Sequence, residues 1–257
     1  MLVKDQLHRE LVFKKTPQRI VSLVPSQTEL LVDLQLKEQL VGITKFCVHP
    51  GTLRNEIEVV GGTKQVHIDK IRSLAPDVII CNKEENTEAM VNDLTDVAPV
   101  WVSDIVTLED SYGMIDALGS LFDRTERASA IIRKIKEEAY QFSKQLQQKE
   151  FKKVAYLIWK DPYMVAGGKT FINSLLRLNK FQNIFTEAHS RYPVISLEEM
   201  QGADLILLSS EPFPFKENDV LALKKALQKE VLLVDGEYFS WYGSRLEKAF
   251  QYFKKLH

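Results

Sequence analysis

Short apolar runs alternate with helical stretches along the whole chain. A short apolar run bounded by turn residues is typical of a buried strand, and strands that alternate with helices are typical of βαβ units. We therefore predict an α/β fold with mainly parallel sheets. The predicted strands are Ile20–Val24, Leu40–Ile43, Val59–Val60, Val78–Cys81 and Val100–Val102 in the first half, and Val154–Trp159, Met164–Ala166, Leu205–Ser209 and Val231–Val234 in the second.

The two halves of the chain resemble each other in pattern. Residues 68–77 lead straight into the apolar run at residues 78–80, and residues 196–204 lead in the same way into residues 205–208. Two similar α/β lobes imply a cleft between them, and clefts between lobes are where small ligands bind.

The segment between the halves has a helical pattern. Thr107, with Asp110 three residues on, predicts the cap of a helix over Leu108–Leu121. Asp123, with Glu126 three residues on, predicts the cap of a second helix, and no Gly or Pro interrupts residues 124–152. If that stretch is helical throughout, it is about 40 Å long. A coiled-coil helix is the alternative, but the apolar stripe covers too few heptads to favour it.

These patterns predict three parts. Residues 1–106 form an N-terminal α/β lobe, residues 107–150 form a helical connector with a long rigid backbone helix, and residues 151–257 form a C-terminal α/β lobe.

Composition and charge restrict the classes of protein to which this chain can belong. A formal net charge of −1 with no basic block argues against a nucleic-acid binder, which needs positive charge to neutralise phosphates. The two cysteines, Cys47 and Cys81, are too few for a disulfide framework, and we expect them to be buried. We expect no transmembrane segment. As written, the chain shows no signal peptide or lipid-accepting cysteine, which indicates a cytoplasmic location; a trimmed N-terminus would instead allow a periplasmic or cell-surface one.

Linear enzyme motifs are missing from the chain. The paired glycines Gly61-Gly62 and Gly167-Gly168 fit neither the dinucleotide fingerprint nor the P-loop. No motif in the sequence pairs a nucleophile with a base. This makes an enzyme a weaker interpretation than a binding protein, but it does not exclude one.

Aromatic and polar residues follow the predicted strands, where the ligand crevice of a doubly wound sheet lies. Trp159 suits core packing as well as ligand contact, whereas Trp241 and Tyr242 lie in a polar loop that favours the cleft. His49 and His67 are either metal ligands or solvated loop histidines. Arg245 meets either an anionic group of the ligand or a helix carbonyl.

Taken together and in order, several segments make the chain similar to the substrate-binding proteins of ABC importers for cobalamin, siderophores and haem. The resemblance spans residues 19 to about 257, and it implies two α/β lobes joined by a rigid helical backbone. The segments that carry it are residues 19–30, 59–64, 71–80, 166–172 and 196–199.

The resemblance also implies site residues. It places ligand contacts at Phe46, Trp159, Tyr163 and Trp241. Corrinoid receptors of this kind carry a tryptophan where this chain has Gly62-Thr63-Lys64, and this departure weakens the case for cobalamin in particular without removing it. Lys64 and Lys83 instead suit a chelate that bears carboxylates.

Docking on a transporter is implied in the same way. Receptors of this class meet arginines of the transporter's membrane subunits through one carboxylate on each lobe, and Asp69 and Glu198 lie at the corresponding helix starts. The alternative is that each carboxylate only meets the helix dipole.

We therefore expect a binding protein without intrinsic cofactor or catalytic residues, whose ligand is a metal chelate or corrinoid such as cobalamin, a ferric siderophore or haem. The possible partners are ABC transporter membrane subunits. Two alternatives remain open: a cytosolic carrier on the same scaffold, and an enzyme acting on a tetrapyrrole or metal centre with His49, His67 or Glu84.

Overall fold

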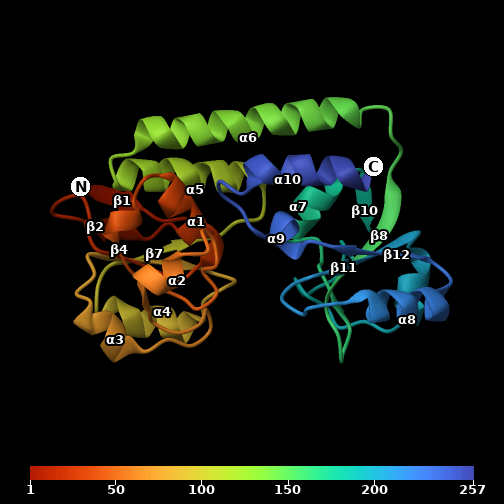
Figure 1. The fold of residues 1–257 in the computed structure, drawn as a ribbon, viewed down its shortest axis with the longest axis horizontal. Helices are drawn as coiled ribbons and strands as arrows, with labels where there is room; N and C mark the ends of the chain where they lie inside the picture. Colours follow the sequence, from red (N-terminus) through yellow and green to blue (C-terminus); the bar gives the residue numbers. More distant parts are fainter. The chain divides into compact units, whose positions relative to one another are not determined.

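The computed structural model describes residues 1–257, and contacts between residues divide them into two compact units (Figure 1). Unit 1 comprises residues 1–105, 109–135 and 242–245, and unit 2 comprises residues 106–108, 136–241 and 246–257. Each unit is a mainly parallel sheet covered by helices, so the predicted α/β class with two lobes is confirmed. We describe the units one at a time.

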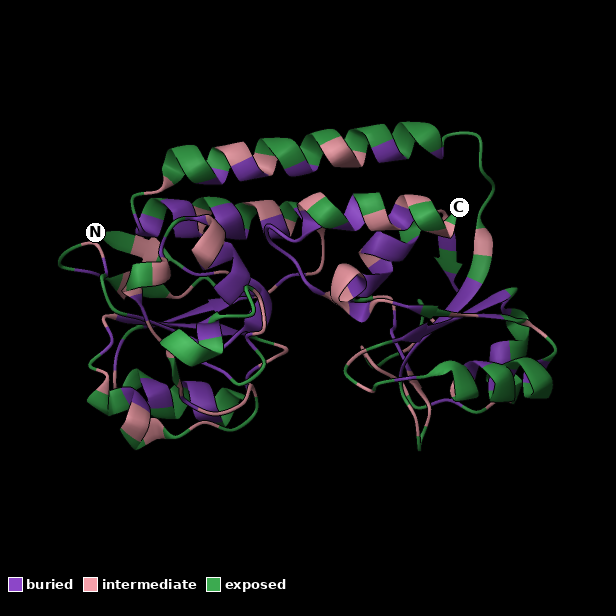
Figure 2. Cartoon of the chain, viewed as in Figure 1, coloured by how far each residue is buried: buried purple, intermediate pink, exposed green.

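Unit 1 contains a five-stranded sheet in the order β5-β4-β3-β6-β7, and all its neighbouring strands are parallel. The central strand β3 is buried along its whole length, as is β6 beside it (Figure 2). Burial on both faces explains why these strands read as continuous apolar runs. The strands are β3 (Ile20–Ser22), β4 (Leu40–Ile43), β5 (Glu58–Val59), β6 (Val78–Asn82) and β7 (Val100–Ser103).

The helices of unit 1 follow its strands. Thr87 caps α4: its side chain accepts a hydrogen bond from the N–H of Met90 in the first turn of the helix. One apolar cluster joins Ile71 of α3 and Leu94 of α4 to Ile79 in the sheet, so these two helices cover the same face. The helices are α1 (Pro25–Asp33), α2 (Leu53–Glu56), α3 (Ile68–Ser73), α4 (Glu88–Thr95) and α5 (Leu108–Leu121), with a 3₁₀ turn at Lys37–Gln39.

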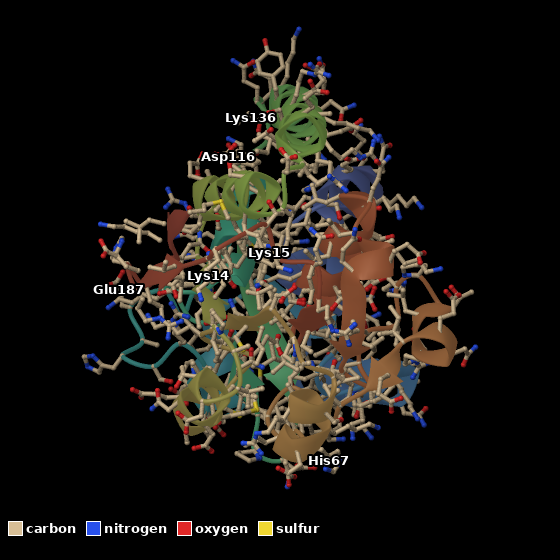
Figure 3. The ribbon with its side chains drawn as sticks, turned by 90° about the vertical axis from the view of Figure 1, so that its left-hand side faces the viewer. Lys14, Lys15, His67, Asp116, Lys136 and Glu187 are labelled. Atoms are coloured by element: carbon tan, nitrogen blue, oxygen red, sulfur yellow. The ribbon has the colours of Figure 1, made fainter.

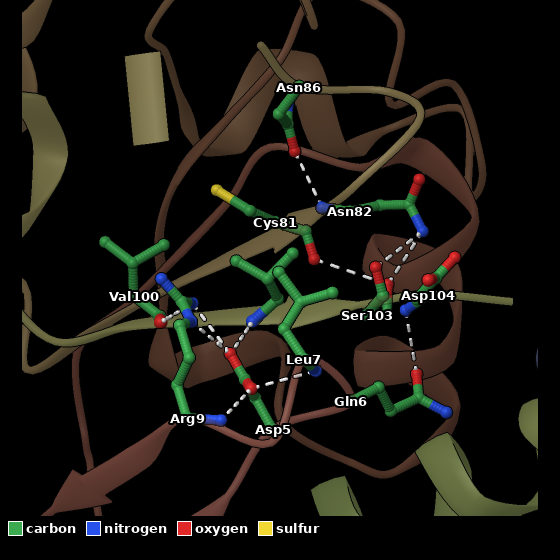
Figure 4. Close-up of polar contacts among 11 residues, drawn as sticks. Asp5, Gln6, Leu7, Arg9, Cys81, Asn82, Asn86, Val100, Ser103 and Asp104 are labelled. Atoms are coloured by element: carbon green, nitrogen blue, oxygen red, sulfur yellow. Dashed lines mark hydrogen bonds and ion pairs between the residues drawn. The ribbon is translucent and has the colours of Figure 1, made fainter. Parts of the chain in front are cut away.

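An antiparallel ribbon of β1 (Leu2–Lys4) and β2 (Glu10–Val12) precedes the sheet and was missed by the sequence patterns. The buried carboxylate of Asp5 fastens this ribbon (Figure 4). It accepts hydrogen bonds from the backbone N–H groups of Leu7 at 3.0 Å, Arg9 at 2.9 Å and Val102 of β7 at 3.2 Å. The Arg9 guanidinium pairs with it at 2.7 Å.

Replacing Asp5 with alanine is expected to lower the free energy of unfolding by about 2 kcal/mol, because several buried donors lose a charged acceptor. Hydrogen exchange is the direct measurement: the amides of Arg9 and Val102 should lose protection while those of β6 keep theirs. Asp5→Asn, which keeps an acceptor oxygen, should lose less. Equal protection in the wild type and in Asp5→Ala would contradict this role.

Unit 2 contains a sheet in which β10, β8, β11 and β12 are neighbours in that order, and all these pairs are parallel. The short strand β9 pairs with β8 in the antiparallel direction. The strand β10 was missed, because only three residues form it and only two of them are buried. The strands are β8 (Lys152–Trp159), β9 (Met164–Val165), β10 (Phe181–Asn183), β11 (Leu205–Ser209) and β12 (Glu230–Val234).

The helices of unit 2 pack on this sheet. Thr170 caps α7 by accepting a hydrogen bond from the N–H of Asn173 at 3.1 Å. Val220 and Leu223 of α8 belong to one apolar cluster with Ile206 of β11. The helices are α7 (Phe171–Leu178), α8 (Glu217–Leu227), α9 (Gly236–Ser240) and α10 (Leu246–Phe253), with 3₁₀ helices at Glu198–Gly202 and Lys254–Leu256.

The helix predicted over residues 124–152 is shorter than expected. Helix α6 (Thr125–Gln145) is about 32 Å long at its 21 residues, and Asp123 lies before it with φ of 57° instead of capping it. The helix ends where its buried stripe ends, at Phe142 and Leu146, and Lys152 already pairs with Phe181 in the sheet. Residues 107–150, predicted as a connector, are shared between the units, which divide α6 after Ile135.

Candidate functional site

A buried polar cluster lies where the strands of unit 1 end. Because parallel strands end at the same edge, Asn82 of β6 and Ser103 of β7 are neighbours, and Asn82 donates to the Ser103 hydroxyl at 2.9 Å (Figure 4). The side chain of Gln27, in the first turn of α1, donates to Ser103 and, at 3.3 Å, to the phenol of Tyr242. All four side chains are buried, and burial raises the pKa of the Tyr242 phenol. Tyr242, a predicted ligand contact, therefore lies among the unit's own polar groups.

Two loops of unit 1 are fastened together at this edge. Asn86 donates to the carbonyl of Thr63 at 2.8 Å and accepts from the N–H of Asn82 at 2.8 Å. The ammonium group of Lys64 donates to the carbonyl of Glu84. The loop after β5 and the loop after β6 thus form one fixed surface.

The sharp turn after β5 depends on Gly61. It has φ of 136°, and an added Cβ would lie 2.7 Å from the carbonyl oxygen of Gln65. A glycine is therefore required where this loop folds back on itself.

Glu85 lies half-buried in the second loop. Burial raises the pKa of its carboxyl above the ordinary 4.5, the charge of Lys64 lowers it, and the charge of Glu84 raises it. Sequence reasoning named Glu84 but not Glu85, because nothing in the sequence distinguishes the two neighbours.

Arg245, predicted to meet an anionic group of the ligand or a helix carbonyl, is paired with a buried carboxylate in this structure. Its guanidinium pairs with Glu29 of α1, with Nε 2.7 Å from Oε2 and Nη2 3.1 Å from Oε1. The two side chains are only 6% and 7% exposed. This two-pronged buried pair joins residues 242–245 to α1 within unit 1, although 216 positions separate the partners.

The other predicted residues of unit 1 are more open. Phe46 is 49% exposed, with the Lys45 ammonium 5.1 Å from its ring centroid. His49 is half-buried. His67 is exposed directly before α3 (Figure 3). Lys83 is paired with Asp104 at 2.6 Å.

Unit 2 presents an aromatic surface where β8 and β11 end. Trp159, the last residue of β8, is 40% exposed and meets the ring of Phe213 edge-on at 5.6 Å between centroids. Phe213 in turn packs on the buried Phe215 at 4.7 Å. We call these three residues the aromatic ladder. Phe213 and Phe215 were not predicted as part of a site; the signal for them in the sequence is the alternation Pro212-Phe213-Pro214-Phe215 after β11.

Trp241 and Tyr163 are less open than Trp159. Trp241 is 8% exposed and its indole N–H donates to Glu211 at 2.9 Å. Ser240 donates to the same carboxylate oxygen at 2.6 Å. Tyr163 is half-buried and packs against the apolar core of unit 2. Of the tryptophans, Trp159 thus offers the most exposed ring.

The two carboxylates predicted to dock lie on the surface. Asp69, in the first turn of α3, has a side chain that is 96% exposed and is paired with Arg72 at 2.6 Å. Glu198 begins the 3₁₀ helix of unit 2, and hydrogen bonds from its own backbone and from Ser196 lower the pKa of its carboxyl.

Several other features of the structure bear on a site. No group of three histidine, cysteine, aspartate or glutamate side chains lies together as a metal centre. No helix has the length and apolar character needed to cross a membrane. Two shallow pockets, of about 450 and 520 Å³, lie elsewhere in unit 1, and no predicted site residue lines them.

The chain belongs to the periplasmic binding protein family, whose model matches residues 20–234. This confirms the resemblance found in the sequence, and the family consists of binding proteins rather than enzymes. An ABC transporter substrate-binding lipoprotein of Bacillus subtilis, itself uncharacterised, is 26% identical over 189 residues, or 70% of this chain and 60% of the relative. A vitamin B12-binding protein of Vibrio parahaemolyticus is 23% identical over 184 residues, or 71% of this chain and 66% of the relative. The matches thus span less than two thirds of these relatives.

Solved structures show the same fold. The periplasmic vitamin B12 binding protein of Vibrio cholerae superposes with a TM-score of 0.79 at 21% identity, covering 93% of this chain and 98% of that one. A periplasmic haem-binding protein of Pseudomonas aeruginosa gives a TM-score of 0.79 at 21% identity, covering 93% and 92%.

Proposed function

We propose that this protein is the substrate-binding component of an ABC importer and captures a metal chelate or corrinoid. The aromatic ladder carries the proposal, since it places the exposed ring of Trp159 at the strand ends of a periplasmic binding protein. In an open α/β sheet, ligands bind at the carboxyl ends of the strands. An aromatic face offers a large apolar area to a flat ligand at a low cost in conformational entropy.

The chemistry of the ligand follows from these groups. The macrocycle of a corrinoid or haem has a broad face that can pack on an indole ring, and its rim carries polar groups that fixed loops can recognise. The metal ion is part of the cargo, so no bond needs to be made or broken by the protein. Relatives that bind vitamin B12 or haem support this class of ligand.

A titration tests the proposal. The purified protein is titrated with cyanocobalamin, haemin and a ferric hydroxamate, with tryptophan fluorescence as the signal and calorimetry as the check against inner-filter effects. Saturable binding of one equivalent of one class is expected at micromolar concentrations or below, about −8 kcal/mol. Absence of binding to all three would refute the proposal.

The transporter is the proposed partner, and Asp69 and Glu198 are the proposed docking residues. Both carboxylates are exposed, and neither contributes to the apolar cores. Asp69→Lys and Glu198→Lys are each expected to weaken binding to the cognate importer's membrane subunits by about tenfold, because a favourable charge pair becomes a repulsive one.

Binding to the importer in nanodiscs measures this effect, and chelate affinity should stay the same. Glu187→Lys, an exposed substitution of the same charge change in unit 2, is the matched control. If the docking variants bind the membrane subunits like this control, the carboxylates serve only the starts of their helices.

A further inference from the structure

The backbone of Glu85 is held firmly while its carboxyl is left without a partner. The side-chain oxygen of Asn82 accepts the N–H of Glu84 at 2.8 Å and the N–H of Glu85 at 3.1 Å. Asn86 ties the same loop to Thr63. The Glu85 carboxylate itself makes no hydrogen bond or salt bridge, although the residue is half-buried.

None of the charged and titratable groups around Glu85 donates a hydrogen bond to its carboxylate. Lys64, from the neighbouring loop, gives its hydrogen bond to the carbonyl of Glu84. Glu84 adds a like charge from the same loop. Burial, and also the charge of Glu85, raises the pKa of the Tyr242 phenol and of the Cys47 thiol, and both of these groups are buried and neutral.

A half-buried carboxylate without donors costs stability, so its retention calls for an explanation. Perturbed carboxyl groups gather at functional sites, where a ligand supplies what the protein does not. The position of Glu85, three residues after the carboxyl end of β6, is where the proposed function requires ligand groups to lie.

We propose that Glu85 is a specificity-determining acceptor, which takes hydrogen bonds from N–H donors on the rim of the bound chelate and disfavours a rim of carboxylates. This inference rests on the proposed function and narrows its ligand class. A corrinoid carries carboxamide N–H groups around its rim, whereas haem carries propionates. The lysines once assigned to a carboxylate-bearing ligand are engaged, Lys64 with a backbone carbonyl and Lys83 with Asp104.

The pH dependence has a definite sign. The Glu85 carboxyl ionises at a higher pH than an ordinary glutamate, because burial disfavours its charge. As pH rises through this pKa, the stronger acceptor raises affinity for amide donors and lowers affinity for carboxylates. In the free protein the same charge is destabilising, so its cost is absent at low pH and appears as pH rises.

The experiment compares the wild type with Glu85→Gln, which keeps the shape and removes the charge. Calorimetry with cyanocobalamin and with haemin is repeated across the pH range. At about pH 7 the variant should bind cyanocobalamin about tenfold more weakly and haemin more tightly, because a charge-assisted hydrogen bond becomes a neutral one. Glu88→Gln, which removes an exposed charge in α4 of the same unit, should change neither affinity.

Stability of the ligand-free protein provides the second readout. Glu85→Gln should raise the melting temperature by about 2 °C at pH 7 and leave it unchanged near pH 4. Opposite shifts for the two ligands, together with this gain in stability, support the proposal. Equal changes for both ligands, or no change with either, overturn it while leaving the proposed function standing. Failure of the wild type to bind any chelate overturns both.

Discussion

Arg245→Met is expected to destabilise unit 1 by about 3–5 kcal/mol, the usual cost of removing one partner from a buried ion pair. The variant keeps most of the apolar stem but leaves the Glu29 carboxylate without its two-pronged partner in a site where it is 7% exposed. The melting temperature of the transition that reports unit 1 should fall by about 10 °C.

Two comparisons make this prediction sharp. Arg133→Met removes an exposed arginine of the same unit and should change the melting temperature by less than about 2 °C. The double variant Glu29→Gln/Arg245→Met should be less destabilised than the sum of its single changes, since no buried charge is left unpaired. A single variant that melts like Arg133→Met would show that the pair contributes little.

Trp159→Ala is expected to weaken chelate binding about 30-fold, because the largest exposed ring of the aromatic ladder is removed. Calorimetric titration with whichever chelate the wild type binds measures the loss. Trp159→Phe keeps an aromatic face and should lose less. Since the indole is 40% exposed, the melting temperature should change little.

The same strand supplies the control for this change. Phe151, directly before β8, is 53% exposed and carries the Lys180 ammonium 5.0 Å from its ring centroid. It lies at the amino end of the strand, away from the ladder at the carboxyl end. Phe151→Ala should therefore leave affinity unchanged. If both alanine variants bind like the wild type, the ladder is not a ligand surface.

Most of the fold could be predicted from the sequence, because the pattern of apolar residues that marks a buried strand lies within the strand itself. A strand buried on both faces must be apolar at nearly every position, so β4 and β11 were predicted with the bounds that the structure has. The missed elements lack that signal: β1 and β2 form a solvent-exposed ribbon, and only three residues form β10. The end of α6 was missed because pairing of Lys152 with Phe181 depends on a partner about thirty residues away.

The candidate site could be predicted only in part from the sequence. The loops after the strands could be named from the order of the segments alone, and the structure shows exposed rings at Phe46, in one such loop, and at Trp159, the last residue of β8. Which loop side chains turn inward could not be read, since burial depends on residues far along the chain. Tyr242 meets Gln27 across 215 positions and Trp241 meets Glu211 across 30, so both lie in polar packing that no local pattern signals.

By itself, the sequence determined the class of fold, most of its buried strands and the family, because each depends on periodicity and on segments in a fixed order along the chain. Only the tertiary structure decided which polar groups are already paired and which are left unsatisfied. It placed Arg245 on Glu29, Lys83 on Asp104 and nothing on the carboxylate of Glu85. The physical reason is that a charge is satisfied by its neighbours in space, and those neighbours are set by packing.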